Sequence, residues 1–238
     1  MLTFPPCRRT ARWWSLVVAT LFLRATTNAT DYYLGSQAAL QPGVAVTSVP
    51  ALNQLRLAPG DRVFFQAGET FDGPIYLGPE DAGTPERPVE LTSFGAGRAT
   101  IAAGDGSGLV IDNAGGISVS KLDLLGADKS RNTGSGIDAG AYLPGSTKLE
   151  HLRFEHMRIS GFRYGVEIWG WHSTDTVAWP GFRDVALAEL EVFDNLSEGI
   201  RIWGTWVPDH TGGNYSHANI RVSDCAVYDQ RGDPASAV

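Results

Sequence analysis

The stretch LRFEHMRIS, residues 152–160, has apolar side chains at its first, third, sixth and eighth positions. The same spacing occurs at residues 117–125, 185–193 and 220–228, so that the four copies are offset by 35, 33 and 35 residues. A weaker copy, 28 residues before the first, consists of Val89, Leu91 and Phe94. Recurrence at an interval of this size is typical of stacked structural repeats. We therefore expect each copy to form the same part of one turn of a solenoid.

A second short segment accompanies each copy, and in it a glycine precedes alternating apolar and polar residues. Alternation with period two is typical of a β-strand with one buried face. Within the nine-residue pattern, the two residues between the third and sixth positions reverse the inward and outward phase, which predicts a corner between two strands. The runs are short and flanked by glycine and β-branched residues, so we do not expect helices there. The glycines are Gly108, Gly136, Gly165 and Gly199.

Two or three short strands in each turn of roughly 30 residues predict an all-β fold, a right-handed parallel β-helix with coils ~4.8 Å apart. On these repeats, residues 31–238 resemble the secreted polysaccharide lyases and related β-helix proteins of the pectate lyase-like superfamily. We expect residues 30–88 to form an amino-terminal cap and the first coil, with a short helix at residues 50–57 over the open end. Residues 89–238 should form regular coils. The chain stops where another glycine-led strand should begin, so we expect its carboxy-terminal end to be incomplete.

Residues 1–29 have the features of a secretory signal peptide. Three arginines precede the apolar run at residues 13–23, and small residues follow it at 27–29. The run is short for a membrane-spanning helix. We therefore expect a secreted or periplasmic protein with no membrane span in its mature form.

The charge of the mature chain limits its partners. Removing residues 1–29 removes four of the 19 basic residues and none of the 26 acidic ones, which leaves 15 minus 26, a net charge of −11. Nucleic acids and anionic membranes require basic patches, so we expect neither as a partner. A polysaccharide is the expected partner, and Ca²⁺ could bridge an acidic one. Cys225 is the only cysteine left, which excludes a disulfide framework and suits a small core residue.

Alignment of the copies predicts which outward side chains lie next to one another on successive coils. One column contains Val110, Asp138, Glu167 and Arg201, and the next contains Asp112, Gly140, Trp169 and Trp203. Flat aromatic rings cover the apolar side of a pyranose ring and charged groups bind its hydroxyls, so the columns predict a sugar-binding groove. They equally predict a structural tryptophan stack beside a ladder of charges. The loop residues that would extend the groove are Trp171, His172 and Trp206.

The resemblance implies lyase-type cleavage of an acidic glycan, in which a basic side chain removes a proton and acidic side chains hold calcium. Lys129 is then the candidate base, and Asp123, Asp128 and Asp138 are the candidate calcium ligands. The candidate catalytic groups on the groove itself are Asp138, Glu167 and Arg201. Two alternatives use the same fold: glycoside hydrolysis by the neighbouring carboxylates, and non-catalytic binding of carbohydrate or of a cell surface.

Overall fold

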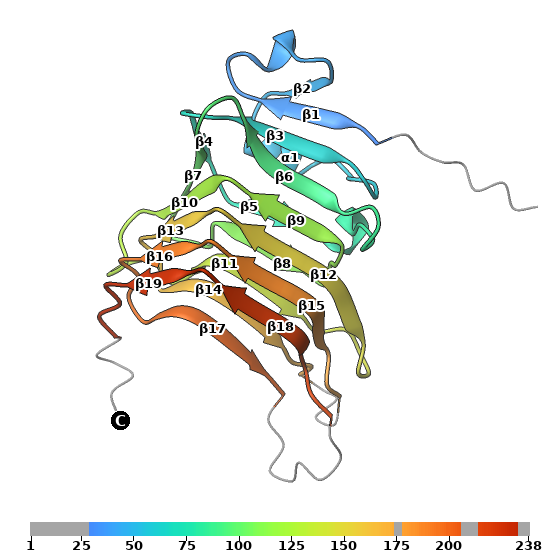
Figure 1. Ribbon diagram of the computed structural model, residues 1–238, viewed down its shortest axis with the longest axis vertical. Coiled ribbons are helices and arrows are strands. Elements are labelled where there is room, and N and C mark those ends of the chain that lie inside the picture. The colour runs from blue at the N-terminus through green and yellow to red at the C-terminus, as the bar shows by residue number, and fades with distance from the viewer. Residues whose placement is uncertain (1–28, 174–177, 206–213, 233–238) are drawn as a thin grey trace, which may run out of the picture.

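The computed structural model describes residues 29–173, 178–205 and 214–232. Within them the chain forms a parallel β-solenoid, seen from the side in Figure 1 with its amino-terminal coils at the top. Successive coils each add a strand to three parallel sheets, which we call A, B and C. The predicted parallel β-helix is therefore confirmed. The predicted signal peptide, except for Ala29, lies outside the described residues.

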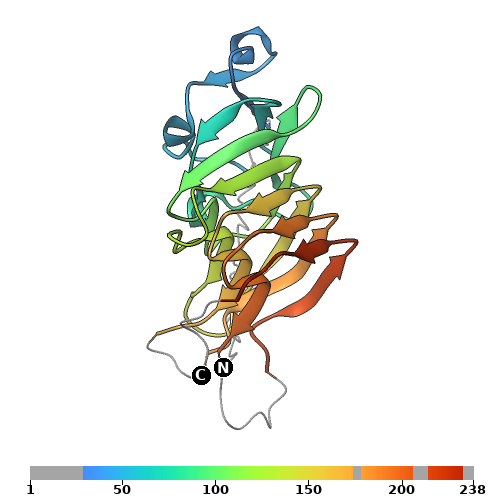
Figure 2. The same ribbon diagram turned by 90° about the vertical axis from the view of Figure 1, so that its left-hand side faces the viewer.

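Apart from β2, which lies at the outer edge of sheet A beyond β1, the strands of each sheet follow the order of the coils, and Figure 2 shows the stack from a second side. Sheet A contains β2 (Val44–Val46), β1 (Asp31–Leu34), β3 (Arg62–Gln66), β6 (Val89–Phe94), β9 (Ile117–Ser120), β12 (Lys148–Glu155), β15 (Gly181–Ala188) and β18 (Ala218–Ser223). Sheet B contains β4 (Thr70–Asp72), β7 (Ala99–Gly104), β10 (Leu122–Gly126), β13 (Arg158–Ser160), β16 (Glu191–Phe193) and β19 (Ala226–Tyr228). Sheet C contains β5 (Ile75–Leu77), β8 (Leu109–Asp112), β11 (Ser135–Ala141), β14 (Tyr164–Gly170) and β17 (Glu198–Gly204). The short helices are η1 (Ala38–Leu40), α1 (Val49–Leu52) and η2 (Pro79–Asp81). None of the helices in the described part of the chain is long and apolar enough to cross a membrane.

The strand register follows the repeat pattern. Leu152 pairs with Ile117 in the preceding coil and with Val185 in the next, and Val185 pairs with Ile220. The corresponding positions of sheet B pair in the same way. Leu152 and Ile117 have no exposed surface. The core is therefore a set of columns in which each inward residue contacts the residue at the same position of the neighbouring coil.

One position of the weak early copy was predicted wrongly. Val89 and Leu91 pair with the expected residues of β9, but Phe94 continues β6 and pairs with Gln66. The chain then turns through residues 95–98, and Ala99 takes the place beside Leu122. Because this turn is longer, Ala99 and not Phe94 takes the first inward position of sheet B in this coil.

In the four copies of the nine-residue pattern, the corner from sheet A to sheet B turns on one residue with a left-handed backbone. It is the fifth residue of the nine-residue pattern, where the phase reversal was predicted. The residues and their φ angles are Lys121 (54°), His156 (54°), Glu189 (52°) and Asp224 (56°). The N–H group of each of the first three donates to a backbone carbonyl of the next coil, at 3.1–3.2 Å. These bonds keep the corners in register although a left-handed L-residue costs about 1–2 kcal/mol.

The glycines that begin the strands of sheet C provide space for the next coil. A Cβ atom on Gly165 would lie 2.3 Å from Cγ1 of Val192 and 2.4 Å from the carbonyl oxygen of Gly199. Gly136 meets Ile159 and the carbonyl of Gly165 in the same way, at 2.2 and 2.6 Å. The glycine therefore allows close packing between sheets B and C, and its φ is not in the left-handed region.

The amino-terminal cap closes the first coil with α1 and the residue that follows it. Ser48 caps α1, because its Oγ accepts a hydrogen bond from the Ala51 N–H at 3.3 Å. The amide of Asn53 donates to the Pro74 carbonyl at 2.9 Å and accepts from the Tyr76 N–H at 3.1 Å, which satisfies the outer edge of β5. The helix ends at Leu52, so the predicted bounds of 50–57 were wrong. Leucines 55 and 57 pack on the core without helical structure.

The last described coil is less well covered than the others. Inward positions Val222 and Val227 are 47% and 46% exposed. Cys225, predicted as a core residue, packs against the core but is only partly buried, and its Sγ donates to the Leu187 carbonyl.

Substitution of Gly165 by alanine should lower the free energy of unfolding by about 1–3 kcal/mol, because the new methyl group overpacks the junction with Val192. Gly106→Ala is the matched control, since nothing lies within 4 Å of its added Cβ. Urea titration monitored by tryptophan fluorescence measures both. Equal stabilities for the two variants would contradict the packing role of the glycine.

Substitution of Lys121 by glycine should raise the free energy of unfolding by up to about 1 kcal/mol, because glycine adopts φ of +54° without a Cβ penalty. Lys121→Val should lower it by more than about 1 kcal/mol, since a β-branched residue is disfavoured in this conformation. Thermal unfolding of the three proteins gives the order. A glycine variant less stable than the valine variant would refute the left-handed corner.

Candidate functional site

The outer face of sheet C carries the two predicted columns. Asp138 on β11 pairs with Glu167 on β14, which pairs with Arg201 on β17. In the second column, Trp169 lies between Gly140 and Trp203. The structure therefore brings the candidate catalytic residues of the groove onto three adjacent strands.

The tryptophans belong to a longer line of aromatic rings, which we call the aromatic row: Tyr142, Trp169 and Trp203. Both pairs are stacked: the ring centroids of Tyr142 and Trp169 are 5.7 Å apart and those of Trp169 and Trp203 are 5.8 Å apart, with an interplanar angle of 13° in each pair. Sequence reasoning missed Tyr142, which follows the end of β11. The signal available in the sequence was the alignment of the coils. Ala141 pairs with Gly170, so Tyr142 takes the position that another aromatic residue, Trp171, takes in the next coil.

Each tryptophan of the row is bound by an acid of the preceding coil. Trp169 Nε1 donates to Asp138 Oδ1 at 2.8 Å, and Trp203 Nε1 donates to Glu167 Oε1 at 2.8 Å. The Trp169 indole also covers Gly140, because a Cβ there would lie 2.4 Å from Trp169 Cζ2. Both contacts are made with β11 of the preceding coil, at Asp138 and at Gly140, and together they fix the position of the indole over that strand.

Burial changes the acidity of one carboxyl group in the face. Loss of solvent around the half-buried Asp138 raises the pKa of its carboxyl, and the negative charges of Glu167 and Asp112 act in the same direction. Hydrogen bonds from Trp169 and from Ser107 act to lower this pKa. Asp138 is therefore a carboxyl group that keeps its proton to higher pH than an exposed aspartate.

Glu167 has a different set of partners. It accepts hydrogen bonds from Trp203 and from Ser135 Oγ at 2.9 Å, and Arg201 Nε lies 3.7 Å from its Oε1. The Arg201 guanidinium also lies over two rings, 4.8 Å from the centroid of Tyr164 and 5.5 Å from that of Trp203. The two neighbouring acids thus have unlike environments, one desolvated and one beside a cation.

Two of the three predicted loop residues extend the face. Trp171 and His172 line a hollow of about 340 Å³ together with Ser173 and two members of the aromatic row, Tyr142 and Trp169. The Trp171 side chain is 46% exposed. The third, Trp206, lies outside the described residues.

Of the predicted lyase base and calcium ligands, Asp138 lies on this face, and Lys129, Asp123 and Asp128 do not. Lys129 Nζ forms an ion pair with Asp194, at the corner between sheets B and C. Asp123 is on β10 of sheet B, and Asp128 accepts hydrogen bonds from Ser130 in the loop after β10. Within the described ranges, no three His, Cys, Asp or Glu side chains are placed to hold a metal ion.

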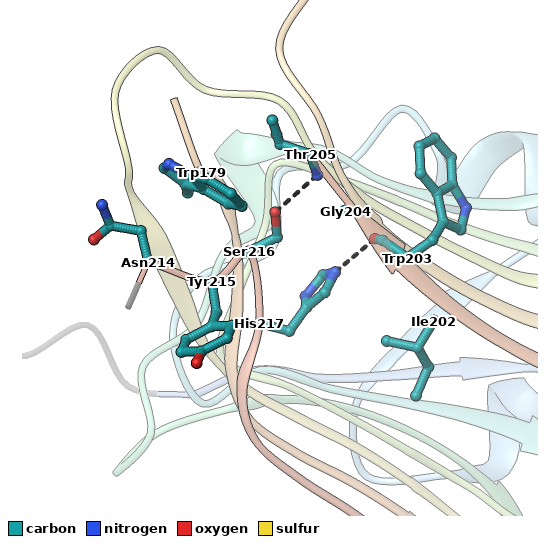
Figure 3. Close-up of a pocket in the computed structure, with 9 residues that line it drawn as sticks. All are labelled: Trp179, Ile202, Trp203, Gly204, Thr205, Asn214, Tyr215, Ser216 and His217. Carbon is teal, nitrogen blue, oxygen red and sulfur yellow. Dashed lines mark hydrogen bonds between the residues drawn. The ribbon is translucent and has the colours of Figure 1, made fainter. Parts of the chain in front are cut away.

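A second hollow, of about 370 Å³, lies beside the end of β17 and is drawn in Figure 3. The His217 imidazole accepts from the Phe182 N–H at 3.2 Å through Nδ1 and lies 2.8 Å from the Trp203 carbonyl through Nε2, so it links sheets A and C. Burial lowers the pKa of His217, which favours the neutral form that these two bonds require. Trp203, a member of the aromatic row, is also among the residues that line this hollow, and Figure 3 shows its indole turned away from His217.

The comparisons with known proteins concern the fold alone. No protein-family model and no curated protein matches this chain. Among solved structures, two of the GH136 lacto-N-biosidase from Eubacterium ramulus are similar, the selenomethionine derivative with a TM-score of 0.62 at 15% identity and the native protein with 0.60 at 14%. Each match covers 84% of this chain and 42% or 41% of the neighbour. The chain thus spans about two fifths of the length of these neighbours and shares their parallel β-helix fold.

Proposed function

We propose that this chain belongs to a carbohydrate-active β-helix protein and that the outer face of sheet C binds its glycan. The observation that carries the proposal is the hollow of about 340 Å³ that Tyr142, Trp169 and Trp171 line together with His172 and Ser173, beside the carboxylate that binds the Trp169 indole. Such rings offer apolar surface to pyranose units, and the adjacent acids accept hydrogen bonds from hydroxyl groups. The neighbours of the same fold are described as lacto-N-biosidases, glycan-cleaving proteins, which supports this choice.

We propose a neutral glycan in place of the acidic one that the resemblance implied. The face carries four acids, Asp112, Asp138, Glu167 and Glu198, and these would repel a chain of uronates. Arg201 lies among them, with its Nε within 4 Å of both glutamates, and the Arg163 guanidinium lies 5.5 Å from the centroid of the Tyr164 ring. A neutral sugar avoids this repulsion while its hydroxyls can still donate to the carboxylates.

The reaction that the acids suit best is glycoside hydrolysis. This chemistry uses two carboxyl groups, one that keeps its proton and donates it to the leaving oxygen and one that acts as a carboxylate. Asp138, desolvated, suits the first role, and Glu167, beside Arg201, suits the second. Lyase-type elimination needs a base near the uronate, and the candidate base Lys129 is paired with Asp194.

A second candidate function is binding without cleavage. It is favoured by one observation: all four carboxylate oxygens of Asp138 and Glu167 accept hydrogen bonds from indole or hydroxyl donors of the protein. Acids used in this way position the aromatic row and need no further role.

Removal of one ring should weaken glycan binding. We expect Trp169→Ala to raise the Kd for neutral oligosaccharides about tenfold, the loss of roughly 1.4 kcal/mol of ring contact. Tyr215→Ala is the control, because Tyr215 is 69% exposed and does not line the hollow that Trp169 lines. Calorimetric titration with neutral β-linked oligosaccharides, and with polygalacturonate as the acidic comparison, gives both values. Tighter binding of polygalacturonate than of every neutral glycan would overturn the proposed substrate charge.

Hydrolysis should depend on Asp138. We expect Asp138→Asn, which keeps an acceptor for the Trp169 indole, to lower the release of reducing ends at least about 100-fold. The acid must be protonated, so activity should be lost as pH rises through the raised pKa of Asp138. Trp169→Phe removes a hydrogen bond that lowers this pKa, so the alkaline limb should move to higher pH.

Trp203→Phe is the matched control for this shift, because its indole binds Glu167 and not Asp138. An alkaline limb that does not move in Trp169→Phe would remove Asp138 as the acid. Products that absorb in the ultraviolet as unsaturated uronates would restore the lyase reaction, and binding without any release of reducing ends would leave the second candidate.

A further inference from the structure

One wall of the hollow beside Trp169 is held by the preceding coil. Tyr142, which forms this wall, follows the end of β11, and its N–H donates to Asn113 Oδ1 at 2.7 Å. The Asn113 N–H in turn donates to the Gly140 carbonyl at 2.8 Å. Burial raises the pKa of the Tyr142 phenol, and the charge of Asp112 and a hydrogen bond to its carboxylate act in the same direction. The end of β8 therefore holds Tyr142 by both its backbone and its side chain.

The same carboxylate binds a phenol of the coil before it. The Tyr76 hydroxyl, on β5, donates to Asp112 Oδ2 at 3.0 Å. Burial, followed by this bond, raises the pKa of Tyr76 to about 12, so the hydroxyl keeps its proton at neutral pH. Asp112 thus lies between a phenol of the preceding coil and Tyr142 of the next, and the first bond limits how far its carboxylate can turn from the second.

Asp112 is not one of the described residues that line the hollow, so it affects a ligand there through Tyr142. The Tyr142 ring is 40% exposed and stacks on Trp169. An exposed ring that is free to turn loses conformational entropy when a ligand fixes it, and a ring already held in place loses less. A fixed Tyr142 therefore favours binding although the residue that fixes it makes no contact with the ligand.

We propose, resting on the glycan-binding function above, that Asp112 is a positioning residue of this site. Its carboxylate, held by Tyr76, keeps the Tyr142 ring in place as one wall of the hollow. The site is thus completed by three coils, since β5 fixes the acid on β8 that fixes the ring after β11.

The charge of Asp112 gives this residue a second effect, on Asp138. Val110 pairs with Asp138, and Asp112 lies two residues further along the same face of β8. On its other side Asp138 pairs with Glu167 of β14, and Arg201 of β17 lies beyond Glu167. Like charges favour the protonated form of a carboxyl group. Removal of the Asp112 charge should therefore lower the pH at which Asp138 loses its proton.

The wall is tested by a double-mutant cycle on the Kd for the β-1,4-linked trimers of glucose and of N-acetylglucosamine. We expect Asp112→Ala and Tyr142→Phe each to raise the Kd of the trimer that binds roughly threefold to tenfold. The double variant should raise it no further, because both changes remove one interaction. Glu90→Gln, at an exposed acid of β6, is the control for lost charge. An unchanged Kd in both single variants, or fully additive losses, would overturn the proposal, and Tyr142→Phe decides the outcome if Asp112→Ala does not fold.

The arrangement can also be measured by NMR without a ligand. The Trp169 indole donates to Asp138, so its Nε1–H resonance should shift as Asp138 titrates. We expect Asp112→Asn to move the midpoint to lower pH by roughly 0.3–1 unit. Asp112→Ala should weaken the nuclear Overhauser contacts between the rings of Tyr142 and Trp169, and Glu90→Gln should change neither observable.

The two measurements separate this inference from the function on which it rests. Ring contacts that persist undiminished in Asp112→Ala would overturn the positioning role whether or not a glycan binds, and an unmoved midpoint in Asp112→Asn would remove the second effect. Failure of the unaltered protein to bind any glycan, with the ring contacts weakened in the variant, would count against the glycan-binding function and leave Asp112 as the residue that positions Tyr142.

Discussion

The structure depends on the parallel, in-register pairing of each coil with the next. The backbone groups of one coil bond to those of its neighbours, and Leu152, between Ile117 and Val185, shows how inward side chains meet their equivalents. A slip of one residue would turn every inward side chain of a strand outward, because side chains alternate along a strand. Each coil must therefore regain the same phase after every corner.

Two local features let the chain meet this constraint. A single left-handed residue, such as His156 or Glu189, reverses the inward and outward phase of the side chains between sheets A and B. The N–H group of that residue still donates to a carbonyl of the next coil. A glycine at the start of each sheet C strand, such as Gly165, leaves space for the side chain of the next sheet B strand. The first feature costs conformational energy and the second costs backbone entropy, and both are repeated in every regular coil.

The candidate site is a consequence of the same stacking. A tryptophan in one coil reaches the acid of the preceding coil, so Trp169 with Asp138 and Trp203 with Glu167 form two equivalent units one coil apart. Burial beneath these rings keeps Asp138 protonated to higher pH, while Arg201 neutralises Glu167. Repetition thus gives a surface with a regular spacing, and local differences between coils give its two acids different chemistry.

The sequence by itself determined the fold, the coil register and both outward columns of sheet C, because the alternation of apolar residues records which face each side chain takes. It could not place Phe94, Tyr142 or Lys129. These residues lie at strand ends or in loops, where the repeat no longer applies and distant neighbours decide the position. Lys129 meets Asp194, 65 residues away, and the Trp169 indole lies where Gly140 leaves space for it. Only the tertiary structure could decide these contacts, since each depends on the free volume and charge that other coils present.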